Sequence, residues 1–231
     1  MSTLGRVRRL AADAGVPAGL LLLILLPSSA GVLRLADLGG VAHLLPDSPR
    51  MAALPVPVAL HIVAAIGYAA VGAFQFVGSF RRRHPRWHRL AGRVLVGLGL
   101  AVAGSAAWMA LAYDRQPGSG ELAFVLRLVF AVAMAGSLVL GVAAIRRGNL
   151  AGHQAWMIRA YAIAVSAGTQ VITLAVAPLF GSGTLNYDLG LGAGWFVNLV
   201  VAQLILRPRS PRSPRSPRSA PSRTPTLRLT R

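Results

Sequence analysis

The side chains best suited to chemistry gather in one ten-residue stretch, Gly152 to Tyr161, which reads GHQAWMIRAY. Its histidine, tryptophan and arginine, which are His153, Trp156 and Arg159, stand at the start of a long apolar segment. An imidazole can ligate a metal or haem iron, and a guanidinium binds phosphate or carboxylate through paired hydrogen bonds. The stretch therefore predicts either a ligand site or an anchor at a membrane boundary.

The positions of the histidines bear on haem and metal binding. His84, His88 and His153 fall near one predicted membrane face, whereas His61 lies about one turn inside the opposite face. Two histidines at matched depth on different helices can hold haem b, so His88 and His153 form the haem alternative, a membrane electron carrier. No carboxylate or thiol accompanies the three clustered histidines, and neighbouring arginines repel a cation. We therefore predict no metal site and no cofactor, with haem b as the alternative.

The sequence contains none of the common catalytic patterns. It has no cysteine, which excludes disulfides, iron–sulfur clusters and thiol catalysis. It also shows no Ser-His-acid set, no pair of intramembrane carboxylates and no phosphate-binding loop. The sequence thus favours a non-enzymatic protein, and we assign no catalytic residue.

Arginines concentrate at the same predicted face as His153. One group runs from Arg81 to Arg93 and a second from Arg146 to Arg159, with almost no acid to pair them. Such arginines suit anionic lipid headgroups, which the cytoplasmic preference of basic residues also predicts, or another anionic ligand. Arg159 is the strongest candidate, because it lies about one turn inside the span rather than in a loop. The candidate ligand-binding residues are Arg159, His153, Trp156, Arg93, His88, Gln75 and His61.

The composition is that of an integral membrane protein. Hydrophobic residues make up 55% of the chain and charged residues 13%, and roughly 20 apolar residues cross a bilayer as a helix. The predicted fold class is all-α, a polytopic transmembrane helical bundle with about six spans. These spans are 16–33, 58–80, 90–113, 122–145, 155–179 and 189–206.

The first span is open to a second interpretation. Its arginine-bearing start, short apolar core and small residues after Pro27 are also typical of a cleavable signal peptide, whose loss would leave five spans. We predict that it is retained as a helix, since the apolar run reaches spanning length. At the other end, residues 207–231 repeat Arg-Ser-Pro. Proline and like charges disfavour regular structure, so we predict a disordered tail that does not bind nucleic acid.

The distribution of charge predicts the orientation. With both termini in the cytoplasm, 20 of the 24 arginines fall on the cytoplasmic side, and five of the six acids, all but Asp13, fall outside. This arrangement matches the positive-inside rule. We therefore predict a cytoplasmic N-terminus over 1–15, an external loop over 34–57 and a helical core over 58–206, in the cell membrane. Bilayer lipids, and anionic headgroups in particular, are the expected partners, and a membrane protein partner is left open.

Polar residues recur at helical spacing in two of the predicted spans. The stripes comprise His61, Tyr68 and Gln75 in the second span and Arg159, Ser166, Gln170 and Thr173 in the fifth. Polar groups within hydrocarbon usually face other protein or a cavity. We expect the two stripes to meet, either through hydrogen bonds between helices or around a polar cavity.

Four pieces of the sequence together resemble a known family: HIVAAIGYAAVGAFQF, RRRHPRWHRLAGRV, AAIRRGNLAGHQAWMIRAYA and WFVNLVVAQ. From about Val56 to Gln203 the chain is similar to the bacterial predicted-membrane-protein family catalogued as domain of unknown function 2306. The resemblance implies a membrane protein but supplies no established reaction. The matching positions are His61, Gln75, His88, Gly92, Arg93, His153, Trp156, Met157, Arg159, Tyr161, Trp195 and Asn198.

Two positions depart from the pattern of that family. The family tends to carry an arginine where this chain has Gln170, and an acid where it has Gln203. If those charges form a pair or a site in relatives, this chain has lost both members. A mechanism that rests on them does not carry over to it.

Overall fold

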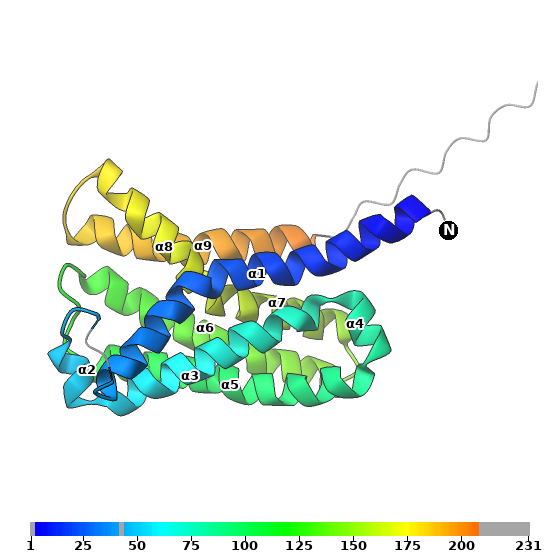
Figure 1. Ribbon diagram of the computed structural model, residues 1–231, viewed down its shortest axis with the longest axis horizontal. Helices are drawn as coiled ribbons and strands as arrows, with labels where there is room; N and C mark the ends of the chain where they lie inside the picture. The colour runs from blue at the N-terminus through cyan, green and yellow to red at the C-terminus, as the bar shows by residue number, and fades with distance from the viewer. Residues whose placement is uncertain (1–2, 42–43, 208–231) are drawn as a thin grey trace, which may run out of the picture.

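The computed structural model describes residues 3–41 and 44–207, and the regular structure in this part of the chain is helical (Figure 1). Within it, five helices are long and apolar enough to cross a membrane, and one bent pair of helices passes the same test as a sixth span. The predicted all-α transmembrane bundle is therefore confirmed. The predicted disordered tail lies outside the described residues from position 208 onward.

The elements follow one another as alternating spans and short connections. The spans are α1 (Thr3–Leu38), α3 (Pro55–Ala73), α5 (Pro85–Ala112), α6 (Glu121–Arg146), the pair α7 (Leu150–Ala164) and α8 (Ser166–Val176), and α9 (Thr184–Leu206). The shorter elements are α2 (Pro49–Ala53), the 3-10 helix η1 (Phe74–Phe76), α4 (Gly78–Arg83) and the 3-10 helix η2 (Ala177–Phe180). Prolines occupy the first turns of α2, α3 and α5, where the missing N–H has no helical partner to lose.

Successive spans run in opposite directions, so their connections gather at two ends of the bundle (Figure 1). Helix α5 lies between α3 and α6, α7 packs on α6, and α9 contacts α6, α7 and α8. Helix α1 lies outside, against α3 and α8. We call the end with α4, the α6–α7 turn and Arg207 the basic end, and the end with α2 and the connections 113–120 and 181–183 the opposite end.

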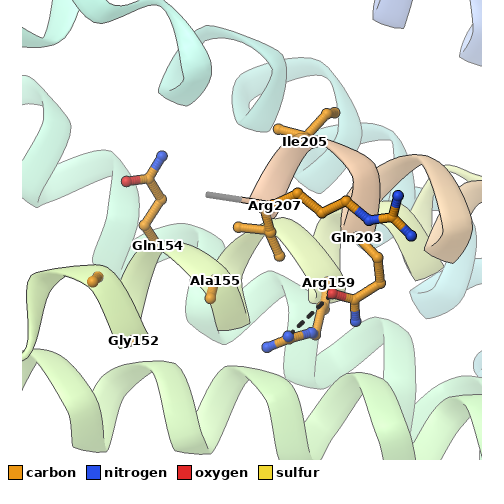
Figure 2. Close-up of a pocket in the computed structure, with 9 residues that line it drawn as sticks. Gly152, Gln154, Ala155, Arg159, Gln203, Ile205 and Arg207 are labelled. Atoms are coloured by element: carbon orange, nitrogen blue, oxygen red, sulfur yellow. Dashed lines mark hydrogen bonds between the residues drawn. The ribbon is translucent and has the colours of Figure 1, made fainter. Parts of the chain in front are cut away.

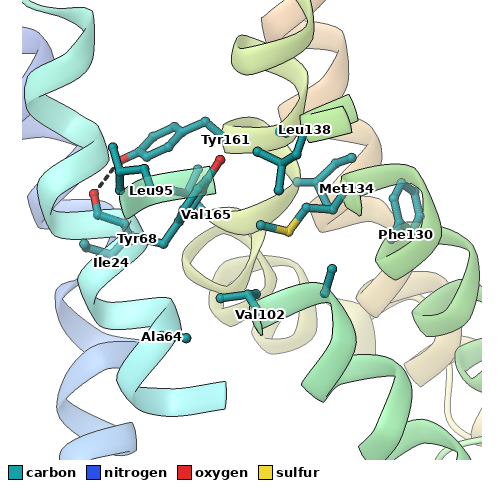
Figure 3. Close-up of a cluster of buried hydrophobic side chains, with 14 residues drawn as sticks. Ile24, Ala64, Tyr68, Leu95, Val102, Phe130, Met134, Leu138, Tyr161 and Val165 are labelled. Carbon is teal, nitrogen blue, oxygen red and sulfur yellow. Dashed lines mark hydrogen bonds between the residues drawn. The ribbon is translucent and has the colours of Figure 1, made fainter. Parts of the chain in front are cut away.

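Side chains from α1, α3, α5, α6 and α7 form the core, and Tyr161 of α7 packs within it beside Tyr68 of α3 (Figure 3). The Tyr161 hydroxyl donates a hydrogen bond to the Ala69 carbonyl oxygen at 2.7 Å. Its ring meets Phe76 edge-on at 4.9 Å between centroids and Tyr68 at 5.8 Å. A side chain at position 72 would collide with this ring, so Gly72 is what lets α3 and α7 approach. The core thus fixes α7, and the residues it carries, against α3.

The second predicted span, 58–80, is shorter in the structure. Helix α3 ends at Ala73, η1 follows, and Val77 is extended with φ −77° and ψ 101° before α4 starts. Four of the six residues of α4 are Ser79 and the three arginines 81–83, which belong at a membrane surface rather than within it. The apolar run therefore continues beyond the point where the helix leaves the span.

The fifth predicted span, 155–179, is two helices rather than one. Helices α7 and α8 meet at Val165 with a bend of 44°. A break inside a bilayer must satisfy the backbone groups that it frees. Here the Ala162 carbonyl oxygen accepts hydrogen bonds from the Ser166 hydroxyl at 2.9 Å and from Asn198 Nδ2 at 3.1 Å.

The first helix is longer than the predicted span 16–33, and it contains Pro17 and Pro27. About half of its residues from Ala14 onward are exposed and only Pro17 and Ile24 are buried, as expected for a helix that borders lipid. Its contacts with α3 and α8 show how a retained first helix would pack. Retention itself, against cleavage as a signal peptide, stays a prediction.

A buried carboxylate joins two helices at the opposite end. Asp188 of α9 is 1% exposed, and its Oδ1 accepts a hydrogen bond of 2.9 Å from the backbone N–H of Gly120. Gly120 directly precedes α6. This contact therefore ties the first turns of α9 to the start of α6.

Replacing Asp188 with alanine is expected to destabilise the protein by about 1–3 kcal/mol, because the partly buried N–H of Gly120 loses its acceptor. Asp188→Asn keeps an amide oxygen at the same place and should cost much less. Thermal unfolding of the two variants and the parent in detergent checks this. Equal losses for asparagine and alanine would show that the charge, not the acceptor, holds this contact.

Candidate functional site

The turn between α6 and α7 sets the position of the candidate site. Gly148 has a φ of 74°, which glycine adopts without strain. Asn149 caps α7, since its side-chain oxygen accepts a hydrogen bond of 2.8 Å from the backbone N–H three residues on. His153 Nδ1 lies 2.9 Å from the Gly141 carbonyl oxygen of α6, and a carbonyl partner requires this nitrogen to carry the proton. These contacts hold the start of α7 on α6 and so direct Arg159.

Arg159 lies further along α7, at its junction with α9 (Figure 2). Its Nη2 donates to Oε1 of Gln203 at 3.3 Å, and its guanidinium lies 4.8 Å from the centre of the Trp156 ring. Both partners are neutral. Among the described residues the ion pairs join Arg34 to Asp37 and Arg115 to Glu121, at the opposite end. The positive charge of Arg159 is therefore not balanced by a carboxylate in the described part of the chain.

Two surface grooves share Arg159 and Gln203. The first, of about 650 Å³, lies between the start of α7 and the end of α9, and Figure 2 shows the residues that line it. Its polar side chains are Gln154, Arg159, Gln203 and Arg207. Two guanidinium groups and two amides on one groove are suited to phosphate or carboxylate. We call this the headgroup groove.

The second groove, of about 360 Å³, lies between α6, α7 and α9. Its walls are mainly apolar, and we call it the apolar groove. Besides Arg159 and Gln203, its lining includes Ala133, Gly136, Ser137, Leu140, Trp156, Ile163 and Leu199. The Ser137 hydroxyl donates to the Ala133 carbonyl oxygen at 2.7 Å, within its own helix.

Sequence reasoning identified only part of this arrangement. Arg159 and Trp156 were predicted and do lie together, but Gln154 and Arg207 were not predicted as ligand residues. Gln203 was noted only as a departure from the family pattern. A polar residue one turn before the end of an apolar span is the signal that identifies Gln203 as a candidate.

The other predicted site residues lie apart from Arg159. His61 Nδ1 lies 3.1 Å from the Ser105 hydroxyl and 3.2 Å from the Val102 carbonyl oxygen, both of α5. Arg93 is exposed on α5 and is absent from the lining of both grooves. Gln75 lies in η1, and its Nε2 is buried without a hydrogen-bond partner among the described residues.

His88 and His153, the haem alternative, lie at the basic end within electrostatic range of one another. The Nδ1 of His88 is buried without a hydrogen-bond partner in the described part of the chain. Neither histidine lines the headgroup groove or the apolar groove. Residues 3–41 and 44–207 contain no group of three histidines or acids placed to hold a metal ion. Haem binding by this pair stays a prediction.

The prediction that the two polar stripes meet is wrong. His61 contacts α5, whereas Gln170 of α8 donates to the Leu191 carbonyl oxygen of α9 at 3.0 Å. Helix α3 instead meets α7 through the aromatic rings of Tyr68 and Tyr161. The bend at Val165 is the reason, because it breaks the single helical face on which the fifth-span stripe was placed. The polar side chains therefore lie at separate helix interfaces.

The two family departures also lie apart. Gln170 packs on Gly194, while Gln203 contacts Arg159. Positions 194 and 203 are nine residues apart on α9, which is about 13.5 Å along a helix. Charges at positions 170 and 203 would therefore not pair with each other. An acid at position 203 would instead face Arg159.

The fold and the site define a multi-pass helical membrane protein with an arginine-lined groove at one end. A match to a family model makes this more specific: residues 58–206 match the family described as predicted membrane protein, DUF2306. The chain belongs to this family, as the resemblance implied, and the family's function is unknown. The match covers α3 to α9 and leaves α1 outside it. No curated protein and no solved structure matches the chain significantly.

Proposed function

We propose that the protein binds a phosphate-bearing anion at the basic end, through Arg159 in the headgroup groove. One observation carries this proposal: Arg159 lies in α7, part of a candidate membrane span, yet the partners of its guanidinium, Gln203 and Trp156, are neutral. A charged group at this depth is costly unless it is paired or serves a function. An anion bound in the groove would supply the negative charge that balances Arg159.

The surroundings of Arg159 support binding rather than catalysis. Arg207 lines the same groove, and the arginines of α4 and of the α6–α7 turn share this end, so the local potential attracts anions. Among the described residues the groove lining includes no carboxylate and no imidazole, the groups that most often act as general acid or base. By the positive-inside rule, we further propose that this end faces the cytoplasm.

Replacing Arg159 with glutamine is expected to weaken binding of an anionic phospholipid about tenfold or more, since a hydrogen bond to a charged group contributes about 1.5–3 kcal/mol. The measurement is a titration of the detergent-purified protein with dioleoyl phosphatidylglycerol, followed by native mass spectrometry. Dioleoyl phosphatidylcholine, which has no net charge, should bind more weakly to the parent. Arg86→Gln, at an exposed position of the same end outside the groove, is the control.

A second variant separates loss of the site from loss of the fold. Gln203→Glu places a carboxylate 3.3 Å from Arg159 without removing it. The new ion pair should weaken phosphatidylglycerol binding about as much as Arg159→Gln while leaving thermal stability equal to that of the parent or higher. Unchanged binding in both variants would refute the proposal.

A further inference from the structure

We infer that the anion is the headgroup of a lipid and that one acyl chain of this lipid occupies the apolar groove between α6, α7 and α9. This inference rests on the proposed function, because it names the ligand class of the same site. A free phosphate and a lipid phosphate offer Arg159 the same chemistry. The surface next to Arg159 distinguishes them.

The two grooves share the residues that would hold the phosphate. Arg159 and Gln203 line both of them, so a ligand anchored at this pair extends naturally from one into the other. The headgroup groove reaches the basic end through Arg207, whereas the apolar groove runs along the span between Leu140, Ile163 and Leu199. A lipid has the same order, with a charged headgroup at the membrane surface and an apolar chain that extends into the bilayer.

The lining of the apolar groove suits a hydrocarbon chain. The Ser137 hydroxyl is already engaged with the Ala133 carbonyl oxygen, so it does not require a polar ligand. The small residues Ala133 and Gly136 of α6 create the depression. The Trp156 ring lies beside Arg159 in the lining of the same groove. Charge complementarity at one end and apolar walls along the rest therefore favour one occupant, a phospholipid chain, over a water-soluble anion.

Gly136 offers a position from which a side chain can block the groove. A Cβ built at Gly136 meets no atom within 4 Å, and the same is true of Gly97, which lies at a comparable depth on α5 outside the groove. Gly136→Leu therefore fills the groove, while Gly97→Leu is a matched control with the same gain in helix propensity. Neither change alters Arg159 or Gln203.

Gly136→Leu is expected to weaken dioleoyl phosphatidylglycerol binding about fivefold, the loss expected for roughly ten dispersion contacts. Gly97→Leu should match the parent. Binding of glycerol phosphate, which carries the same anion without acyl chains, is followed by phosphorus NMR and should be equal in both leucine variants. Native mass spectrometry measures the lipid arm.

The outcomes separate this inference from the proposed function. Equal phosphatidylglycerol affinity in Gly136→Leu and Gly97→Leu overturns the acyl-chain assignment, and the anion site still stands if Arg159→Gln weakens binding. If Arg159→Gln changes neither ligand, the proposed function fails, whatever the leucine variants do. A fall in glycerol phosphate binding in Gly136→Leu alone would mean that the leucine disturbs the anion site itself, which also counts against the assignment.

Discussion

Replacing Gly168 with alanine is expected to displace α1 from the bundle. A Cβ at position 168 of α8 would overlap the backbone carbonyl oxygen of Leu23 in α1, and a backbone atom cannot swing aside as a side chain does. Forcing an extra methyl group into a packed contact costs about 1–3 kcal/mol. From Ala14 onward only Pro17 and Ile24 of α1 are buried, and besides α8 the helix packs on α3. The cost therefore falls on the α1–α8 crossing rather than on the whole fold.

The sequence of α1 explains why its backbone is available at this crossing. Pro27 has no N–H, so the carbonyl oxygen of Leu23, four residues earlier, lacks its helical donor. The overlap of the added Cβ with this oxygen means that a Cα hydrogen of Gly168 points at it. Contacts of the Cα–H···O type contribute about 0.5–1 kcal/mol. Pro27 thus leaves the Leu23 carbonyl oxygen without a helical donor, and Gly168 of the other helix comes close enough to contact it.

A disulfide measures the position of α1 directly, since the chain has no native cysteine. A Cβ built at Gly31 of α1 lies 3.9 Å from the Cβ of Ile62 in α3, and disulfides join Cβ atoms roughly 3.5–4.5 Å apart. The double variant Gly31→Cys, Ile62→Cys should therefore cross-link on oxidation. Adding Gly168→Ala should lower the yield several-fold, whereas adding Gly19→Ala, where a Cβ meets nothing within 4 Å, should not. Equal yields with Gly168→Ala and Gly19→Ala would contradict the predicted displacement.

The spans and the leading site residue were predictable from the sequence because both depend on local composition. A run of about 20 apolar residues has one stable arrangement in a bilayer, a helix across it. An arginine inside such a run is costly unless it has a partner or a function, so the sequence alone indicates Arg159 as a candidate. Trp156 lies one turn before Arg159 on the same helix, and its contact with Arg159 follows from helical spacing.

The partners that complete the site were not predictable, because they depend on which helices pack together. Gln203 lies 44 residues from Arg159, and only the packing of α9 on α7 brings the two together. The bend at Val165 has only a weak local signal: neither proline nor glycine stands there, and Ser166 beside it bonds the carbonyl oxygen four residues earlier, a contact that often bends helices. That carbonyl oxygen also accepts a hydrogen bond from a distant helix, from Asn198 of α9. Hydrogen bonds between segments that are distant in the sequence leave no repeating residue pattern, so one sequence alone does not predict them.

Replacing Tyr161 with alanine is expected to destabilise the protein by about 3–5 kcal/mol, as for other large aromatic side chains removed from a core. Tyr161 is 5% exposed, and its ring fills the space between Phe76, Tyr68 and the glycine at position 72. Its loss removes dispersion contacts, which remain favourable in a bilayer even though lipid offers no hydrophobic gain for burial. Thermal unfolding in detergent measures the loss.

Tyr161→Phe separates the contribution of the ring from that of the hydroxyl group, and it also tests whether Tyr161 affects lipid binding. Phenylalanine keeps the ring and loses only the hydrogen bond to the Ala69 carbonyl oxygen, so it should cost about 0.6 kcal/mol, the average for such bonds in a membrane. Tyr161 is on the same helix as Arg159, two residues later. Loosening α7 on α3 should therefore also weaken phosphatidylglycerol binding in Tyr161→Ala but not in Tyr161→Phe. If both variants bind the lipid as the parent does while only Tyr161→Ala loses stability, α7 is positioned for binding by its contacts with α6 and α9 alone.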